Sequence, residues 1–201
     1  MRMRYLLLFS AGVILVLGAV TAFALTRPHR FGGSLIDPPV PAPDIELSDA
    51  GGEKFRLDDQ SGNAVLLFFG YTSCPDVCPV TLADFKAIKT QLGPRADRVK
   101  FVFITVDPER DSPERIRRYL ANFDEEFIGL TGSRADLEPV WKAYGVFQEQ
   151  VASSSSVGYL VDHSSRIYAI DPRGNLRVTY LFGTDRQDIA DDVLFLLNEQ
   201  R

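Results

Sequence analysis

The sequence predicts an α/β fold in which a central mixed β-sheet is flanked by helices and preceded by an N-terminal transmembrane helix. Strand-like and helix-like patterns alternate from residue 64 to residue 144, which is typical of βαβ units with a parallel sheet. The runs at residues 64–69 and 99–106 are continuously apolar, as expected of strands buried on both faces. A turn at residues 171–175 joins two later strand-like runs into a closing hairpin.

The N-terminal segment is predicted to anchor the chain in a membrane. Residues 6–25 carry no charge, and as a helix they would span about 30 Å, the thickness of a bilayer's hydrocarbon core. Arg2 and Arg4 precede this run, which favours a cytoplasmic N-terminus. The alternative is a cleaved signal peptide, because residues 22–24 (Ala-Phe-Ala) resemble a cleavage site. In both cases the following domain is exported.

The N-terminal segment also predicts the cellular location of the protein. It lacks the Arg- and Ser-rich character of a mitochondrial presequence, so we expect a single-pass protein of the bacterial inner (cytoplasmic) membrane with its soluble domain facing the periplasm. We divide the chain into a membrane anchor at residues 1–26, a Pro/Gly-rich linker at 27–44 and a folded domain at 45–201. The net charge is −5 and no Lys/Arg cluster follows residue 30, which argues against nucleic-acid binding.

The elements of the domain follow from periodicity and end signals. Strands are expected at 64–69, 99–106, 127–130, 159–161, 167–170 and 176–181, and helices at 79–92, from 113, at 133–144 and at 184–197. Ser112 and Ser133 are expected N-caps, Gly93 and Gly145 expected ends, and residues 184–187 an expected capping box. Residues 148–158 have no periodicity and are expected to form a surface loop. Trp141, Tyr144 and Phe147 are interpreted as core residues.

Cys74 and Cys78 are the only cysteines, and they lie between the apolar run at 64–69 and the helix that follows. The N-terminus of a helix favours a thiolate over a thiol, and thiolates suit Cu(I). In an oxidising compartment the same pair could form a disulfide. A purely structural disulfide is a poor explanation, because closing so short a loop removes little chain entropy.

The surroundings of the cysteines resemble a known family. Residues 71–79 read Tyr-Thr-Ser-Cys-Pro-Asp-Val-Cys-Pro, which resembles the signature of the Sco/SenC family of copper proteins. Residues 106–111, 162–165 and 170–174 resemble that family too, in the same order. The resemblance runs from about Ile45 to the C-terminus. It implies a thioredoxin-like fold, membrane tethering, copper binding and a role in assembling the dinuclear copper centre of cytochrome c oxidase.

The resemblance also implies the metal ligands. His163 matches the copper-ligand histidine of the family, whereas His29 is expected to be a solvated bystander in the linker. Cys74, Cys78 and His163 would hold Cu(I) in trigonal geometry and could also accept Cu(II). Imidazole serves zinc as well, so the identity of the metal rests on the resemblance.

Several aspartates are weaker candidates for a role at the site. Asp76, Asp107, Asp111 and Asp162 are interpreted as turn, cap or solvated residues, with the alternative that Asp162 orients His163. Asp171 is expected to be structural.

Three functions compete. The first is a copper metallochaperone that delivers copper to the copper-A subunit of cytochrome c oxidase, with other periplasmic copper chaperones or thiol reductants as further partners. The second is a thiol-disulfide oxidoreductase that reduces the cysteines of the recipient, for which His163 would be dispensable. The third and weakest is a thioredoxin-like peroxidase.

Thioredoxin-type oxidoreductases place a proline before the strand that faces their cysteines. The chain has no proline between Pro139 and Pro172, which favours metal binding.

Overall fold

The structure is a computed structural model that describes residues 12, 15, 16, 18, 29–152 and 159–199. The chain divides into two units, Met1–Arg30 and Phe31–Arg201. Within the predicted anchor only residues 12, 15, 16 and 18 are described, all of them helical, so this prediction lies largely outside the described residues. Among the residues described, no helix combines the length and the apolar character needed to cross a bilayer.

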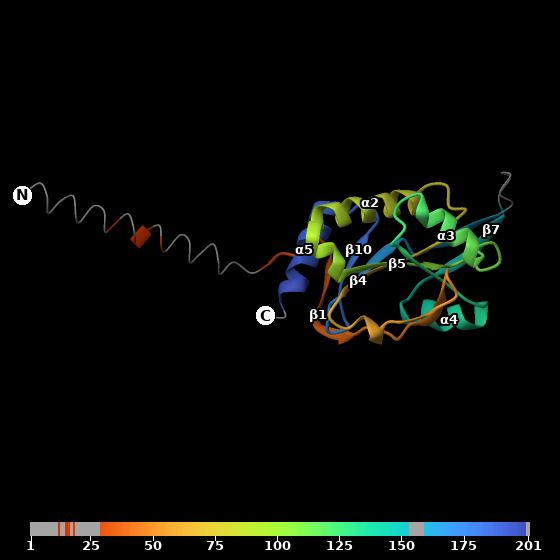
Figure 1. Ribbon diagram of the computed structural model, residues 1–201, viewed down its shortest axis with the longest axis horizontal. Coiled ribbons are helices and arrows are strands. Elements are labelled where there is room, and N and C mark those ends of the chain that lie inside the picture. The colour runs from red at the N-terminus through yellow and green to blue at the C-terminus, as the bar shows by residue number, and fades with distance from the viewer. Residues whose placement is uncertain (1–11, 13–14, 17, 19–28, 153–158, 200–201) are drawn as a thin grey trace, which may run out of the picture. The chain divides into compact units, whose positions relative to one another are not determined.

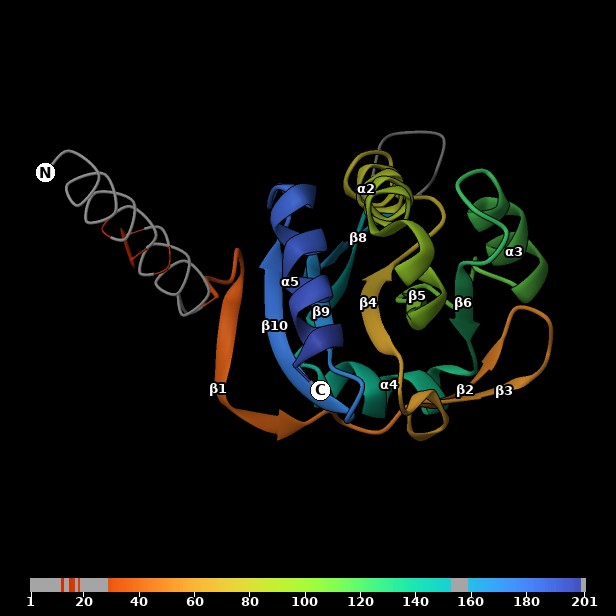
Figure 2. The same cartoon turned by 60° about the vertical axis from the view of Figure 1, so that its left-hand side comes forward.

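The second unit is built on an eight-stranded mixed sheet, in the order β1-β10-β9-β4-β5-β6-β2-β3 within the described residues (Figures 1 and 2). The strands are β1 (Ser34–Pro41), β2 (Glu46–Asp49), β3 (Lys54–Arg56), β4 (Ala64–Gly70), β5 (Val99–Thr105), β6 (Ile128–Thr131), β9 (Arg166–Ile170) and β10 (Asn175–Leu181). β4, β5 and β6 are parallel, whereas β9 pairs with both β4 and β10 in antiparallel fashion. The predicted mixed sheet is therefore confirmed.

Helices cover both faces of this sheet. They are α2 (Val77–Leu92), α3 (Pro113–Ala121), α4 (Arg134–Ala143) and α5 (Arg186–Asn198), with short 3-10 helices η1 (Asp58–Gln60) and η2 (Gly93–Arg98). On one face Phe85 of α2 packs edge-on against Phe101 of β5, with ring centroids 5.4 Å apart. On the other face Tyr144, which follows α4, packs 5.5 Å from Phe69 of β4. Figure 1 shows α4 on the opposite side of the sheet from α2 and α3.

The local signals in the sequence account for most of these elements. Every residue of β4 is buried, as a central strand between two helical layers requires. Ser112 and Ser133 cap α3 and α4 as predicted. The start of the last helix differs slightly from the prediction. Its N-cap is Asp185, which accepts a hydrogen bond from the Gln187 amide at 2.8 Å, whereas the predicted capping box began at Thr184.

Three segments in which no strand was predicted nevertheless form strands, and one of them contains both β2 and β3. Residues 34–41, within the predicted linker, form β1 and pair with β10. The expected surface loop at 148–158 is wrong for its first part, because β7 (Gln148–Ala152) pairs with β8 (Tyr159–His163) in a separate two-stranded sheet. β7 is mostly exposed, so its pairing rests on backbone hydrogen bonds and leaves no hydrophobic pattern in the sequence. Residues 153–158 lie outside the described residues.

Candidate metal centre

The two cysteines lie at the carboxyl end of β4, where the chain turns into α2. Cys74 is half-buried in the connecting loop, and Cys78 is fully buried in the first turn of the helix. Gly70, the last residue of β4, lets the sulfur approach the strand closely, since a methyl group on Gly70 would lie only 2.9 Å from Cys78 Sγ. No disulfide joins these two residues in the structure.

Burial changes the expected acidity of Cys78. The apolar surroundings, followed by the hydrogen bond and charge of Cys74, raise the pKa of the Cys78 thiol well above its ordinary value. The sequence-based expectation that the helix N-terminus makes a thiolate is wrong for Cys78 in the metal-free state, because desolvation outweighs the helix dipole. A bound cation would reverse this balance by supplying the missing positive charge.

Asp111 holds the cysteine loop in place. Its buried carboxylate accepts hydrogen bonds from the Thr72 amide at 3.0 Å, from the Thr72 hydroxyl, and from the Thr105 hydroxyl at 2.7 Å. Burial raises the pKa of this carboxyl, although the bonds from Thr72 and Thr105 oppose the effect. Arg115 adds a bond from Nη2 to Ser73 Oγ at 2.9 Å. The interpretation of Asp111 as a cap or solvated residue is therefore wrong.

The β7–β8 hairpin is attached next to this loop by polar side chains. The Tyr71 hydroxyl accepts a hydrogen bond from the Val161 amide at 3.3 Å. The Tyr159 hydroxyl donates to Asp107 Oδ1 at 2.8 Å. Arg110 pairs with Asp107, donates to the Tyr159 carbonyl at 2.9 Å and stacks 3.6 Å above the Tyr159 ring. Asp107 opens a turn, as interpreted, because its carbonyl accepts a hydrogen bond from the Arg110 amide at 3.2 Å. Its side chain is buried and organises this attachment, so the alternative of a solvated charge is wrong.

His163 is the last residue of β8, and its backbone pairs with Gln148. It follows Val161 by two positions, and the Val161 amide is bonded to Tyr71, which lies three positions before Cys74. The structure thus brings the two cysteines together and attaches the strand that carries His163 to their loop. Within the described residues no group of three or more His, Cys, Asp or Glu side chains forms a metal cluster. The full ligand set remains a prediction.

The remaining aspartates take no part in these contacts. Asp76 is exposed at the N-cap of α2 and makes no side-chain cap bond there. Asp162 is exposed on β8 opposite Glu149. Asp171 is buried in the turn before β10 and accepts bonds from the Arg173 and Asn175 amides at 2.9 Å, which confirms its structural role.

Among the aromatic residues near the site, one prediction fails and two residues were missed. Trp141 and Tyr144 are buried as predicted, but Phe147 is 59% exposed, and its amide donates to Ser164 Oγ beside His163. Tyr71 went unnoticed although it opens the cysteine motif, and its partner in β8 lies 90 positions away. Tyr119 lies in the helix predicted from residue 113 and was not singled out, yet its hydroxyl is buried without a partner among the described residues.

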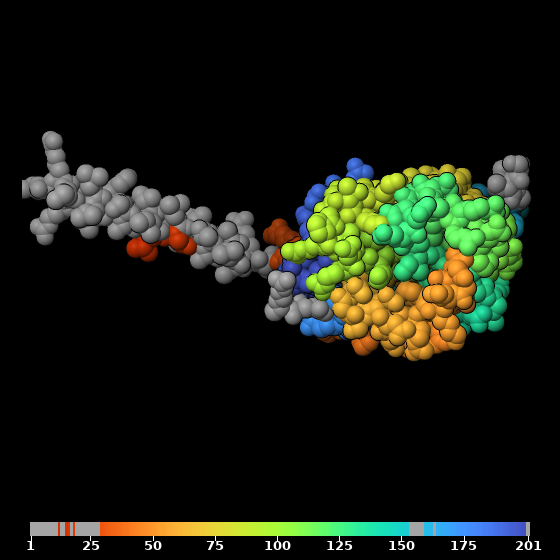
Figure 3. Space-filling model, in the orientation of Figure 1, coloured from red at the N-terminus to blue at the C-terminus, as the bar shows by residue number. Residues whose placement is uncertain are grey.

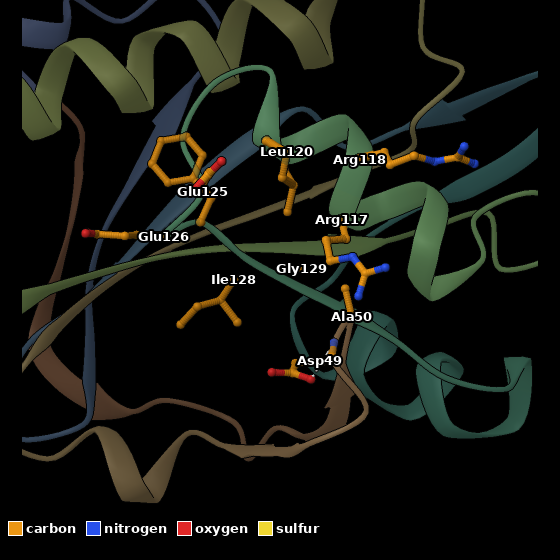
Figure 4. A pocket seen from close by; sticks show the side chains of 12 residues that line it. Asp49, Ala50, Arg117, Arg118, Leu120, Glu125, Glu126, Ile128 and Gly129 are labelled. Carbon is orange, nitrogen blue, oxygen red and sulfur yellow. Dashed lines mark hydrogen bonds between the residues drawn. The ribbon is translucent and has the colours of Figure 1, made fainter.

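A cleft of about 570 Å³ lies elsewhere, between α3 and the turn after β2 (Figure 4). Its lining includes Asp49, Arg117, Leu120 and Ile128, and none of the three predicted ligands. The space-filling view shows the orange β2–β3 region and green α3 on the same face of the domain (Figure 3). The thiols are therefore not at the bottom of this cleft, and the candidate metal centre is a packed loop at the end of the sheet.

Comparison with known proteins identifies the family of this chain. The model of the SCO1/SenC family matches residues 38–198, which include the cysteine loop and the β8 strand. The chain belongs to the SCO1/SenC family. A SCO2-like protein of Rickettsia conorii is 37% identical over 157 residues, which cover 78% of this chain and 75% of that protein.

Solved structures of Sco proteins share the fold. Copper-bound ScoI of Bradyrhizobium japonicum is 32% identical with a TM-score of 0.71, covering 78% of this chain and 99% of that one. Apo Sco1 of Thermus thermophilus is 35% identical with a TM-score of 0.75, covering 84% and 98%. The chain therefore has the thioredoxin-like Sco fold that its cysteine motif predicted.

Proposed function

We propose that this Sco-family chain is a copper metallochaperone that binds one copper ion through Cys74, Cys78 and His163 and delivers it to the copper-A centre of cytochrome c oxidase. The observation that carries the proposal is the placement of two cysteine thiols within hydrogen-bonding reach of each other, next to a loop fixed by buried hydrogen bonds. Such a loop loses little entropy when it binds a metal.

The chemistry of the two sulfurs fits copper. Soft thiolate ligands select Cu(I), and copper in the Bradyrhizobium japonicum relative supports the same metal here. Because burial raises the pKa of the Cys78 thiol, that residue enters the complex by giving up a proton to solvent. The burial of Cys78 then keeps water from its bond to the metal.

His163 would complete the coordination from the β7–β8 hairpin. Release to a recipient would proceed by exchange of one ligand at a time, with the half-buried Cys74 the first sulfur open to an incoming thiolate. The recipient would be the copper-A subunit, and other periplasmic copper chaperones or thiol reductants would load or reduce the site. We place the domain on the periplasmic side of the bacterial inner membrane, held there by an anchor formed by residues 1–26.

A thiol-disulfide oxidoreductase is the second candidate. The observation in its favour is the interaction between the two thiols, since a hydrogen bond between Cys78 and Cys74 that favours the protonated form of Cys78 contributes to its raised pKa. The more exposed Cys74 would attack a disulfide of the recipient, and Cys78 would resolve the mixed disulfide, leaving the recipient reduced and this pair oxidised.

A competition titration with Cu(I) and a chromophoric chelator distinguishes the copper metallochaperone from the thiol-disulfide oxidoreductase. The reduced chain would be compared with Cys74→Ser, Cys78→Ser and His163→Ala, with His29→Ala as the matched histidine control. Tight one-to-one binding that each of the first three substitutions weakens, and that His29→Ala leaves unchanged, supports the chaperone. Weak binding that is indifferent to His163→Ala would overturn it in favour of the oxidoreductase.

A further inference from the structure

Tyr119 of α3 carries a hydroxyl group with no evident structural use. Its ring packs between Phe103 and Phe123, at centroid distances of 6.2 and 5.6 Å. The hydroxyl oxygen is buried and, among the residues that the structure describes, finds no hydrogen-bond partner. Buried polar groups in native proteins nearly always have a partner, so an unpaired one calls for an explanation.

Other buried tyrosines of the domain follow the general rule. The hydroxyl of Tyr144 donates to the Pro43 carbonyl at 2.8 Å, and that of Tyr168 donates to the Tyr144 carbonyl at 3.0 Å. Tyr180 donates to Asp192 Oδ2 at 3.0 Å. A phenylalanine at position 119 would fill nearly the same space without burying an unpaired oxygen. The hydroxyl of Tyr119 therefore suggests an acceptor that exists only in another state of the protein.

The position of Tyr119 points to that acceptor. A methyl group on Gly70 would lie 2.8 Å from the Phe103 ring and 2.9 Å from Cys78 Sγ, so the ring that Tyr119 packs against also borders the buried sulfur. Burial raises the pKa of the Tyr119 phenol, and negative charge on Cys78, Cys74 and Asp111 raises it further, in that order. The phenol thus remains a protonated donor within electrostatic range of both sulfurs.

We propose that the Tyr119 hydroxyl donates a hydrogen bond to the Cys78 sulfur when that sulfur is a metal-bound thiolate. A neutral thiol is a weak acceptor, whereas a thiolate is a charged and much stronger one, so the bond forms only when the metal has displaced the proton. Asp111 is the other anionic group nearby, and the Thr72 and Thr105 hydroxyls already bond to it. Tyr119 is a positioning residue that holds and tunes a ligand.

The inference rests on the proposed function, because it needs a metal at Cys78. Hydrogen bonds from outside the coordination sphere typically change metal affinity by about 10- to 100-fold. They also lower the energy of the sulfur lone pairs, which shifts thiolate-to-metal charge-transfer absorption to shorter wavelength. Both effects would be lost in Tyr119→Phe, which keeps the ring.

The experiment compares the full chain with Tyr119→Phe and Tyr168→Phe. We expect Tyr119→Phe to bind Cu(I) about tenfold more weakly and to shift the thiolate-to-copper absorption to longer wavelength. Its melting temperature in the reduced, metal-free state should be unchanged or slightly raised, since no bond is lost there. Tyr168→Phe loses the bond to the Tyr144 carbonyl, so it should lower the melting temperature and leave the absorption in place.

Three outcomes would overturn the inference. If wild-type protein binds copper and Tyr119→Phe has the same affinity and absorption, the hydroxyl does not reach the ligand. If Tyr119→Phe weakens binding with an unshifted absorption and a lowered melting temperature, its role is structural. If wild-type protein binds no copper, the proposed function fails first and this inference fails with it.

Discussion

The two parts of the proposed copper site are attached to the domain in different ways. The cysteine loop continues directly from β4, a fully buried central strand, and the buried carboxylate of Asp111 fixes its backbone. The strand that carries His163 belongs to a separate two-stranded sheet, which is held near the loop by hydrogen bonds of Tyr71, Tyr159 and Arg110.

This difference separates two requirements of metal transfer. The sulfurs must be positioned in advance if binding is to be tight, and buried contacts provide that rigidity. A ligand that has to leave during transfer is better placed on an element with few buried contacts, because such elements open at a lower free-energy cost. We therefore expect substitutions that remove the hydrogen bonds fixing the cysteine loop to lower mainly stability, and those that loosen the strand carrying His163 to affect mainly copper retention.

The largest effect is expected from Asp111→Ala. It leaves the Thr72 amide and the Thr72 and Thr105 hydroxyls without their buried acceptor, so the free energy of unfolding should fall by about 3 kcal/mol. Chemical denaturation of the reduced protein would measure this. Asp162→Ala, at an exposed position of β8, is the control and should change stability by less than about 0.5 kcal/mol. Equal losses for both would show that the cysteine loop is not the more firmly fixed part.

Gly70→Ala should come next. The new methyl group would lie 2.8 Å from the Phe68 and Phe103 rings and 2.9 Å from Cys78 Sγ, and such overpacking costs about 2 kcal/mol. Because Cys78 is displaced, Cu(I) affinity should fall as well, measured by chelator competition. Gly62→Ala is a useful comparison, since open space surrounds that glycine and any loss there reflects its φ of 89° alone. An unaltered copper affinity in Gly70→Ala would mean that the sulfur position is not set by β4.

The two thiols should differ in reactivity by at least about tenfold, which corresponds to about 1.4 kcal/mol. The thiolate is the reactive form, and burial raises the pKa of Cys78, so iodoacetamide should modify Cys74 first at pH 7.5. The rate at Cys78 should still be increasing at pH 9. Mass spectrometry of peptides from a time course would follow both sites. In denaturant the difference should vanish, and equal rates in the native protein would contradict the burial argument.

A smaller effect on stability is expected from Tyr71→Phe. It removes the acceptor of the Val161 amide and should lower the free energy of unfolding by about 1 kcal/mol. Its effect on copper retention should be larger than this, because the strand carrying His163 loses an attachment to the cysteine loop. Release of Cu(I) to a chelator, followed over time, should be faster than in wild type. Release at the wild-type rate would argue that the hairpin is held by other contacts.

Much of the central fold could be predicted because its signals are local. The apolar run that became β4 and the serine caps of α3 and α4 each depend on neighbouring residues. β1 and β7 could not be predicted in this way. β1 contains prolines that suggest a linker, and it is a strand only because its distant partner β10 is available. β7 pairs with β8, the next strand along the chain, but its exposure leaves no hydrophobic pattern in the sequence.

The same limit applies to the site. The cysteine loop was expected at the end of a central strand because the motif directly follows the apolar run. The role of Asp111 depends on Thr72, which is 39 positions away, and that of Tyr71 depends on Val161, which is 90 positions away. An aspartate beside Ser112 and Pro113 looks like an ordinary helix start until its burial is known. Phe147 was assigned to the core on hydrophobicity alone, and the chain in fact turns it outward after Gly145.

The outermost strands of the sheet bear on how the domain avoids self-association. Exposed strand edges recruit further strands, and natural proteins block them with proline, charge and short length. β1 forms one edge and contains Pro38, Pro39 and Pro41, which lack the amide hydrogen that a new strand would need. β3 forms the other edge with only three residues, two of them the cations Lys54 and Arg56. The segment interpreted as a passive tether is thus also a cap against sheet-to-sheet aggregation.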